Sequence, residues 1–205
     1  SELYITSNGT QFYPSKTATL VAIAQAFLTR GHERVLDAGS GNGVAVAIFS
    51  QFAAYVKGIE IDAYLFRQQV RCINGCLQEL LEEGKIALEQ GDFFGEDFSG
   101  YDLIYFYWPY PGKQQGEYYE HILEEKLLRQ LKRGAVFVLN TNGYTNGFLR
   151  LKEVPFLYDR KIIRDTIKVY RVASASSPVL LANGLGLMAN GQEKEPYAIG
   201  HMLYA

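Results

Sequence analysis

Apolar and polar positions along the chain follow two alternating periods, which predict strands and helices in turn. Stretches of strand length that are rich in apolar residues occupy residues 34–36, 55–60, 85–90, 102–107 and 135–140. Stretches with an apolar residue every three or four positions occupy residues 15–28, 44–49, 62–83 and 117–133. Strands that alternate with helices in this way predict an α/β fold, doubly wound around a mostly parallel sheet with helices on both faces.

Capping residues predict where several of these helices begin and end. Ser15 is expected to cap the first helix and Gly31 to close it. Its apolar side is Leu20, Ile23, Ala24, Phe27 and Leu28. Asp62 is expected to cap the helix over 62–83, and Gly134 to follow the helix over 117–133. The apolar side of the helix over 62–83 is Phe66, Val70, Ile73, Leu77 and Leu80.

The last part of the chain divides into two segments. Extended runs around 156–158 and 166–172 are expected to close the sheet as an antiparallel pair. Residues 174–178 have linker composition, and the Asn-Gly pairs at 183–184 and 190–191 are typical of hairpins. We therefore predict a domain over 1–173 and a linker with a C-terminal extension over 174–205. The extension would form a β-ribbon for self-association or a lid.

A glycine-rich turn joins the first buried strand to the next helix. The sequence is Asp37-Ala38-Gly39-Ser40-Gly41-Asn42-Gly43, and its glycines carry no Cβ that would keep a ligand from the backbone. A strand, a glycine turn and a helix N-terminus together form a common nucleotide site. A turn that serves packing alone is the alternative.

The residues around the turn indicate which ligand it would hold. Counted from Gly39, the sixth position is Val44, so the dinucleotide fingerprint is not satisfied. Glu60 follows about 20 residues after the turn, where an acid can accept both hydroxyls of a ribose. Asp37 would repel a phosphate but can hold an ammonium group. A ligand with a ribose, a positive charge and no phosphate is S-adenosylmethionine.

The turn and Glu60 together resemble the cofactor site of the class I S-adenosylmethionine-dependent methyltransferases, and the resemblance covers residues 12–172. It implies a seven-stranded Rossmann-like sheet, a methyl-transfer activity and S-adenosylmethionine as cofactor. Gly91-Asp92-Phe93 resembles the family's third cofactor motif, in which Asp92 would bind the adenine amino group and Phe93 would offer its backbone N–H. The cofactor-binding residues that we expect are Asp37, Gly39, Ser40, Gly41, Gly43, Glu60, Ile61, Asp92, Phe93 and Tyr105.

The fourth strand ends in an unusual group of aromatic residues, Tyr105-Phe106-Tyr107-Trp108-Pro109-Tyr110. In an open α/β sheet, ligands bind beyond the carboxyl ends of the strands. Aromatic rings at this position can surround a cation or a planar base. We expect Trp108 and Tyr110 to border a channel for an amine acceptor and Tyr107 to orient the lone pair of its nitrogen. Filling of the sheet faces is the alternative, which suits Phe106.

The acceptor stays open between several classes. The strand end and the Tyr-Pro before the first helix are similar to the small single-domain protein-lysine methyltransferases, which favours a protein lysine. Amino-directed nucleic-acid methyltransferases carry an Asn or Asp where this chain has Tyr107, so nucleic acid is less favoured. A small molecule is a further alternative, as is a non-catalytic cofactor-binding module that activates a partner methyltransferase. No metal-ligand spacing is visible, and His32, His121 and His201 are scattered.

Composition agrees with a globular protein that has no global attraction to nucleic acid. Of the 205 residues, 48% are hydrophobic and 20% charged, and the net charge is −2. Cys72 and Cys76, four residues apart in one predicted helix, are expected to be buried thiols. No apolar run has the length of a membrane helix and no signal-peptide pattern is visible, so we expect a cytoplasmic protein without membrane contact, although Ser1 leaves a removed leader open.

Replacement of Trp108 by alanine tests the acceptor channel. If Trp108 borders the acceptor and not the cofactor, Trp108→Ala lowers turnover well beyond tenfold and leaves cofactor affinity nearly unchanged. Steady-state kinetics and calorimetry measure the two quantities. An equal loss of both would assign Trp108 to cofactor binding or to folding.

Overall fold

The computed structural model describes residues 4–5, 11–108, 113–141, 148, 150–157, 166–171 and 180–181. The strands in this part of the chain are β1 (Tyr4–Ile5), β2 (Gln11–Phe12), β3 (Arg34–Ala38), β4 (Tyr55–Glu60), β5 (Ile86–Gln90), β6 (Leu103–Trp108), β7 (Val136–Thr141), β8 (Lys152–Val154), β9 (Phe156–Leu157), β10 (Thr166–Arg171) and β11 (Leu180–Leu181). The helices are α1 (Thr17–Phe27), α2 (Val44–Phe49), α3 (Ala63–Glu82) and α4 (Lys113–Gln130), with single 3-10 turns η1 (Phe93–Gly95) and η2 (Phe98–Gly100).

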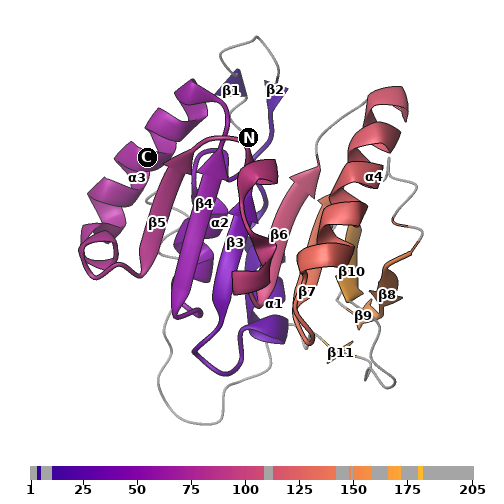
Figure 1. Ribbon diagram of the computed structural model, residues 1–205. Helices are drawn as coiled ribbons and strands as arrows, with labels where there is room; N and C mark the ends of the chain where they lie inside the picture. The colour runs from indigo at the N-terminus through magenta and orange to yellow at the C-terminus, as the bar shows by residue number, and fades with distance from the viewer. Residues whose placement is uncertain are drawn as a thin grey trace.

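One seven-stranded sheet organises the molecule, in the order β5-β4-β3-β6-β7-β10-β8 (Figure 1). The five strands from β5 to β7 are parallel neighbours, and β10 is antiparallel to both β7 and β8. The order reverses at β3, because β4 and β5 lie on one side of it and β6 and β7 on the other. This doubly wound, mostly parallel sheet confirms the fold class predicted from the sequence.

The closing antiparallel pair differs from our expectation in one strand. The run over 166–172 does provide the antiparallel strand β10, but its edge partner is β8 and not the run around Phe156. Pro155 stands between the two strands, lacks an N–H and interrupts the ladder. Beyond it, β9 pairs in parallel with β11, which belongs to the predicted C-terminal extension. The Asn-Gly pairs of that extension lie outside the described residues.

The first helix begins in a different way from our prediction. Lys16 occupies the N-cap position of α1 without a side-chain cap, and the helix ends at Phe27, well before Gly31. The prediction that Ser15 caps this helix is therefore wrong. Its hydroxyl lies 2.7 Å from the hydroxyl of Tyr105 instead, because α1 packs directly over β6. The predicted cap of α3 is confirmed, since Asp62 accepts hydrogen bonds from the backbone N–H groups of Tyr64 and Leu65.

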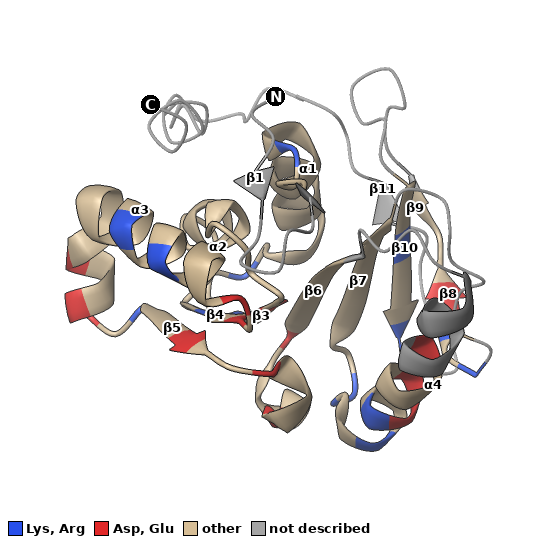
Figure 2. Ribbon diagram, turned by 90° about the horizontal axis from the view of Figure 1, so that it is seen from above, with Lys and Arg blue, Asp and Glu red and all other residues tan. Residues whose placement is uncertain are grey.

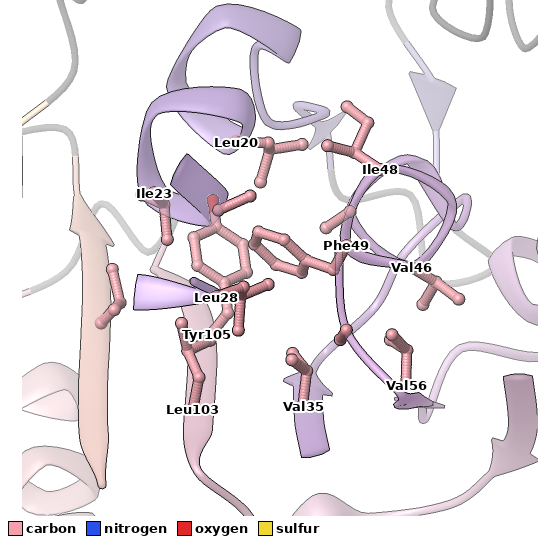
Figure 3. Packing of buried hydrophobic residues seen from close by; sticks show 14 of the residues in the cluster. Leu20, Ile23, Leu28, Val35, Val46, Ile48, Phe49, Val56, Leu103 and Tyr105 are labelled. Carbon is pink, nitrogen blue, oxygen red and sulfur yellow. The ribbon is translucent and has the colours of Figure 1, made fainter. Parts of the chain in front are cut away.

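Two apolar layers cover the two faces of the sheet. Seen from above, α1, α2 and α3 lie on one face and α4 lies on the other (Figure 2). The first layer centres on Phe49 of α2, whose ring meets that of Tyr105 edge-on at 5.4 Å between centroids (Figure 3). The second contains Phe106, Phe137 and Leu127. Phe106 thus fills a face of the sheet, which is the alternative that the sequence suggested for this residue.

Replacement of Gly58 by alanine tests how tightly β4 packs under α2 and α3. A Cβ at this position would lie 2.5 Å from Nε2 of Gln69 and 2.6 Å from a methyl group of Val46. Because both neighbours are buried, we expect Gly58→Ala to lower the free energy of unfolding by about 1–3 kcal/mol in urea denaturation.

Gly75→Ala is the matched control for this substitution. Gly75 is exposed within α3, and a Cβ there meets no atom within 4 Å. Alanine should raise the free energy of unfolding by about 0.5–1 kcal/mol, because glycine loses more backbone freedom in a helix. Equal effects of the two substitutions would contradict the packing described for Gly58.

Candidate functional site

The glycine turn lies at the carboxyl ends of the central strands, between β3 and α2. Gly39, Gly41 and Gly43 all have positive φ angles, of 78°, 56° and 88°. Residues with a Cβ avoid this region, so the path of the turn requires glycine at these positions. The backbone N–H groups of Gly39 and Ser40 donate to the carbonyl oxygen of Ile59 at 2.9 and 3.0 Å, which fixes the turn against β4.

Two side chains approach the glycines so closely that no Cβ would fit. A Cβ on Gly41 would lie 2.4 Å from the ring of Phe12 in β2. A Cβ on Gly43 would lie 2.8 Å from Cγ of Gln69 in α3. The turn is therefore held from both sides, by the N-terminal segment and by α3.

Gln69 is a supporting residue that our sequence analysis missed. Its side chain is completely buried, and its amide nitrogen lies 2.8 Å from the hydroxyl oxygen of Ser40. A glutamine four residues from both Leu65 and Ile73, the two buried apolar residues of α3, was the available signal. The predicted apolar side of α3 was offset by one position over its first turns, because the buried line runs through residues 65, 69 and 73.

Glu60 joins the turn to the start of α3. Its carboxylate is 6% exposed and accepts hydrogen bonds from the backbone N–H groups of Gly41 and Asp62, both at 2.7 Å. Burial raises the pKa of Glu60 although these two bonds act in the opposite direction. Each carboxylate oxygen engaged in this way has a second lone pair with which it can accept a hydrogen bond from a hydroxyl group.

Asp37 is a buried acid without a hydrogen-bond partner at one oxygen. The residue is 2% exposed, and among the described residues nothing donates to Oδ2. Burial, and after it the charge of Glu60, raise the pKa of Asp37 well above its ordinary value. An unsatisfied buried acceptor costs about 1–3 kcal/mol, more when charged. The arrangement would be relieved by a cationic donor placed beside the turn.

The corner after β5 lies next to Glu60. The backbone N–H of Gly91 donates to the carbonyl oxygen of Glu60 at 3.0 Å. Asp92 is exposed and caps η1 by accepting from the N–H of Phe94 at 2.9 Å. Phe93 is half-buried, and its ring lies 5.1 Å from that of Phe106.

Ile61 presents an apolar surface beside the same acid. Directly after Glu60, its side chain is 69% exposed, the largest exposure recorded for a big hydrophobic residue in the described part of the chain. Tyr64, the second residue of α3, is 36% exposed. The predicted cofactor residues of β3, the glycine turn, the end of β4 and the corner after β5 thus lie at the carboxyl ends of neighbouring strands.

Tyr105 lies three residues before the end of β6 and is more deeply buried than we expected for a residue that contacts the cofactor. It is completely buried, it packs against Phe49, and its hydroxyl receives a hydrogen bond from the side-chain Nδ2 of Asn140 at 2.9 Å. Its predicted contact with the cofactor stays a prediction. Tyr107 is half-buried two positions further along β6. Trp108 ends this strand, and its side chain, like the whole of Tyr110, lies outside the described residues.

Two further features concern metals and membranes. In the part of the chain that the structure describes, no three His, Cys, Asp or Glu side chains gather closely enough to hold a metal ion. Cys72 and Cys76 are free and half-buried, and burial raises the pKa of Cys72. None of the described helices combines the length and apolar character needed to cross a membrane.

Comparison with known proteins gives one sequence relative. Protein-L-isoaspartate O-methyltransferase 2 from Anaeromyxobacter sp. (strain Fw109-5) is 36% identical over 80 residues, which are 39% of this chain and 31% of the relative. The chain thus aligns with about a third of that protein's length. No protein-family model matches the chain.

Solved structures of low sequence identity share the fold. An RNA methyltransferase from Salinibacter ruber, in complex with S-adenosyl-L-homocysteine, is 20% identical, with a TM-score of 0.54 over 81% of this chain and 97% of the other. The candidate methyltransferase YhhF from Escherichia coli is 16% identical, with a TM-score of 0.55 over 81% and 94%. The resemblance to the class I methyltransferase fold, predicted from the glycine turn and Glu60, is confirmed.

Replacement of Asp37 by asparagine tests whether its carboxylate is a buried, uncompensated charge. Below the ordinary Asp pKa of 3.8 the carboxyl is protonated in folded and unfolded chains alike. As pH rises above that value the unfolded chain ionises freely, whereas burial keeps the pKa of Asp37 raised in the folded state. Stability is therefore lost with rising pH, and Asp37→Asn should gain at least about 1 kcal/mol over the wild type between pH 4 and pH 7 in denaturation experiments.

Asp97→Asn provides a control of opposite sign. Hydrogen bonds from Ser99 lower the pKa of the exposed Asp97, so its removal should cost stability above pH 4. If both variants followed the wild type in parallel across this range, the account of Asp37 would fail.

Proposed function

We propose that this chain, which has the class I methyltransferase fold, is an S-adenosylmethionine-dependent methyltransferase. The observation that carries the proposal is the pair of buried acids beside the glycine turn, Asp37 with an unpartnered oxygen and Glu60 bound to the turn itself. The name of the sequence relative, a methyltransferase that aligns over 80 residues, and the bound product in the Salinibacter ruber structure support it.

The residues of the site fit this cofactor. Asp37 would hold the positively charged amino group of its methionine part, which supplies the donor that Oδ2 lacks. Glu60 would accept the ribose hydroxyls with the lone pairs left over from Gly41 and Asp62. A phosphate-bearing cofactor would meet two buried acids and is disfavoured. The glycines allow the positive φ angles of the turn that lies beside these two acids.

Ile61, Asp92 and Phe93 are suited to an adenine ring. The exposed side chain of Ile61 offers an apolar face directly after the ribose-binding acid. Asp92 is exposed at the neighbouring corner, where its carboxylate would accept from the adenine amino group and Phe93 would donate its backbone N–H. The backbone N–H of Gly91 donates to the carbonyl oxygen of Glu60, which joins the corner to the acid that would bind the ribose.

The cofactor supplies an activated methyl group on a sulfonium, so the protein mainly has to align donor and acceptor. Such alignment can be worth 10⁵–10⁸ M in effective molarity. The acceptor that we propose is an amine, and a protein lysine is the first choice. Tyr107, with Trp108 and Tyr110 beyond it, would line its path and orient the nitrogen lone pair.

A carboxylate acceptor on a protein is the second candidate. The specific observation that favours it is the name of the sequence relative, which methylates the oxygen of protein L-isoaspartate. Incubation with labelled S-adenosylmethionine and a cell extract separates the candidates. A labelled methyl ester is hydrolysed by mild base, whereas a labelled N-methyl group survives it. Label in nucleic acid or in small molecules would overturn both, and absence of label from every fraction would favour the partner-activating module.

Calorimetry on Glu60 variants tests the cofactor site directly. We expect Glu60→Ala to weaken S-adenosylhomocysteine binding by about 1.5–3 kcal/mol, as for the loss of hydrogen bonds to a charged group. Glu82→Ala is the matched control, because Glu82 is an exposed carboxylate at the end of α3, remote from the turn. Undiminished affinity of Glu60→Ala would remove Glu60 from the ribose role.

A further inference from the structure

Asn140 is a buried polar residue at the acceptor end of the sheet that neither the cofactor site nor our sequence analysis uses. It is the last residue but one of β7, it is completely buried, and its backbone pairs in register with Tyr107 of β6. Its side chain lies on the face of the sheet that carries Tyr105, because its Nδ2 donates to the Tyr105 hydroxyl at 2.9 Å. Asn140 therefore stands beside Tyr107, the last residue but one of β6.

The hydrogen bonds around Asn140 leave its side-chain carbonyl oxygen without a donor from the described part of the chain. Tyr105 accepts from Asn140 and lies 2.7 Å from the hydroxyl oxygen of Ser15, so its own proton can pass to Ser15. A chain of hydrogen bonds thus joins Asn140, Tyr105 and Ser15. Among the described residues, nothing donates to Oδ1 of Asn140. Buried polar atoms almost always have a partner, so an orphaned carbonyl oxygen here indicates a donor that arrives with a ligand.

The position of Asn140 relative to the cofactor site supports a role in the reaction. Asp37 on β3 pairs in register with Tyr105 on β6, and both lie on neighbouring parallel strands. Asn140 lies on the next strand, β7, two residues closer to the carboxyl end than the partner of Tyr105. The strand end itself, Tyr107-Trp108-Pro109-Tyr110, contains no side-chain amide or carboxylate. An amide from the neighbouring strand can supply the missing acceptor.

We propose that the side-chain carbonyl oxygen of Asn140 accepts a hydrogen bond from an N–H of the methyl-acceptor amine and so is a catalytic residue. This inference rests on the proposed function and names a residue that selects its substrate. The lone pair of the neutral amine nitrogen forms the new C–N bond while the C–S bond breaks, and the electron pair of the C–S bond stays on sulfur, which becomes a neutral thioether. The nitrogen becomes an ammonium and later loses its extra proton to water.

The gain comes from the change in charge during this step. As the nitrogen becomes positive, its N–H group becomes a stronger donor, so its bond to Oδ1 strengthens in the transition state. The same bond turns the amine so that its lone pair faces the methyl group. Because Oδ1 is recessed, it suits an amine at the end of a slender, flexible stem, as in a lysine side chain, better than an amino group attached to a ring.

Methyl transfer to two synthetic polymers tests the assignment. Poly-L-lysine carries primary amines, and Nε,Nε-dimethylated poly-L-lysine carries amines that have no N–H when neutral. With labelled S-adenosylmethionine, we expect Asn140→Ala to lower kcat on poly-L-lysine by about 10- to 100-fold, as for one hydrogen bond to a developing charge. On the dimethylated polymer it should match the wild type within about twofold, since no N–H is available to Asn140.

Two further variants separate catalysis from support of the fold. Asn140→Asp retains an acceptor oxygen and should recover at least about a third of the kcat lost in Asn140→Ala. Ser15→Ala removes the far end of the hydrogen-bond chain and should transfer methyl groups within about twofold of the wild type. All variants should bind S-adenosylhomocysteine in calorimetry with wild-type affinity within about threefold.

Several outcomes would overturn the assignment. An equal loss on both polymers, a loss in Ser15→Ala as large as in Asn140→Ala, or a parallel loss of S-adenosylhomocysteine affinity would give Asn140 a structural role. A wild type that binds S-adenosylhomocysteine but labels neither polymer would overturn the amine assignment of Asn140 and leave the cofactor site standing. A wild type that binds no S-adenosylhomocysteine would overturn the proposed function itself.

Discussion

Glu60 connects the three segments that build the candidate site. Through Gly41 it holds the glycine turn, through Asp62 it holds the start of α3, and through its own backbone carbonyl it holds Gly91 at the end of β5. Backbone N–H groups that are buried need acceptors, and one buried side chain provides two here. The spacing of turn, helix and corner therefore depends on a single acid whose charge is kept in a poorly solvated place.

Asp37 is destabilised as an anion by this arrangement. Its carboxylate is buried near Glu60, and the second charge raises its pKa beyond what burial alone would do. Two acids of this kind lower the stability of the ligand-free protein, and a cationic ligand would remove the penalty. Such a site lowers folding stability but increases selectivity, since the negative charge of the two acids, which destabilises the turn, also disfavours phosphates.

The segment before α1 contacts both the glycine turn and β6. Phe12 packs against Gly41, and Ser15, three residues later, lies within hydrogen-bond distance of Tyr105. Because Tyr105 in turn receives a hydrogen bond from Asn140, one short stretch of chain touches both the glycine turn and the network at the end of β7. The hydroxyl of Ser15 is engaged with Tyr105, and Ser15 does not cap its helix.

The sequence pattern was enough to predict those features that depend on residues close together in the chain. The alternating periods predicted the α/β sheet, and the glycines between Asp37 and Val44, with Glu60 one strand later, predicted the cofactor turn, because positive φ and a strand-end acid follow from neighbours in the chain. The predicted edge partner of β10 was wrong. Pro155 separates β8 from β9, and the pairing of each depends on strands that are distant in the sequence.

Only the tertiary structure revealed Gln69 under the turn, the hydroxyl pair of Ser15 and Tyr105, and the unpartnered oxygen of Asn140. Each of these involves residues 29 to 90 positions apart, and hydrogen-bond satisfaction between them is a property of packing. The sequence by itself determined the fold class and the acids beside the turn. The packed sheet decided which buried polar atoms have partners, because burial and pairing arise only when separate elements meet.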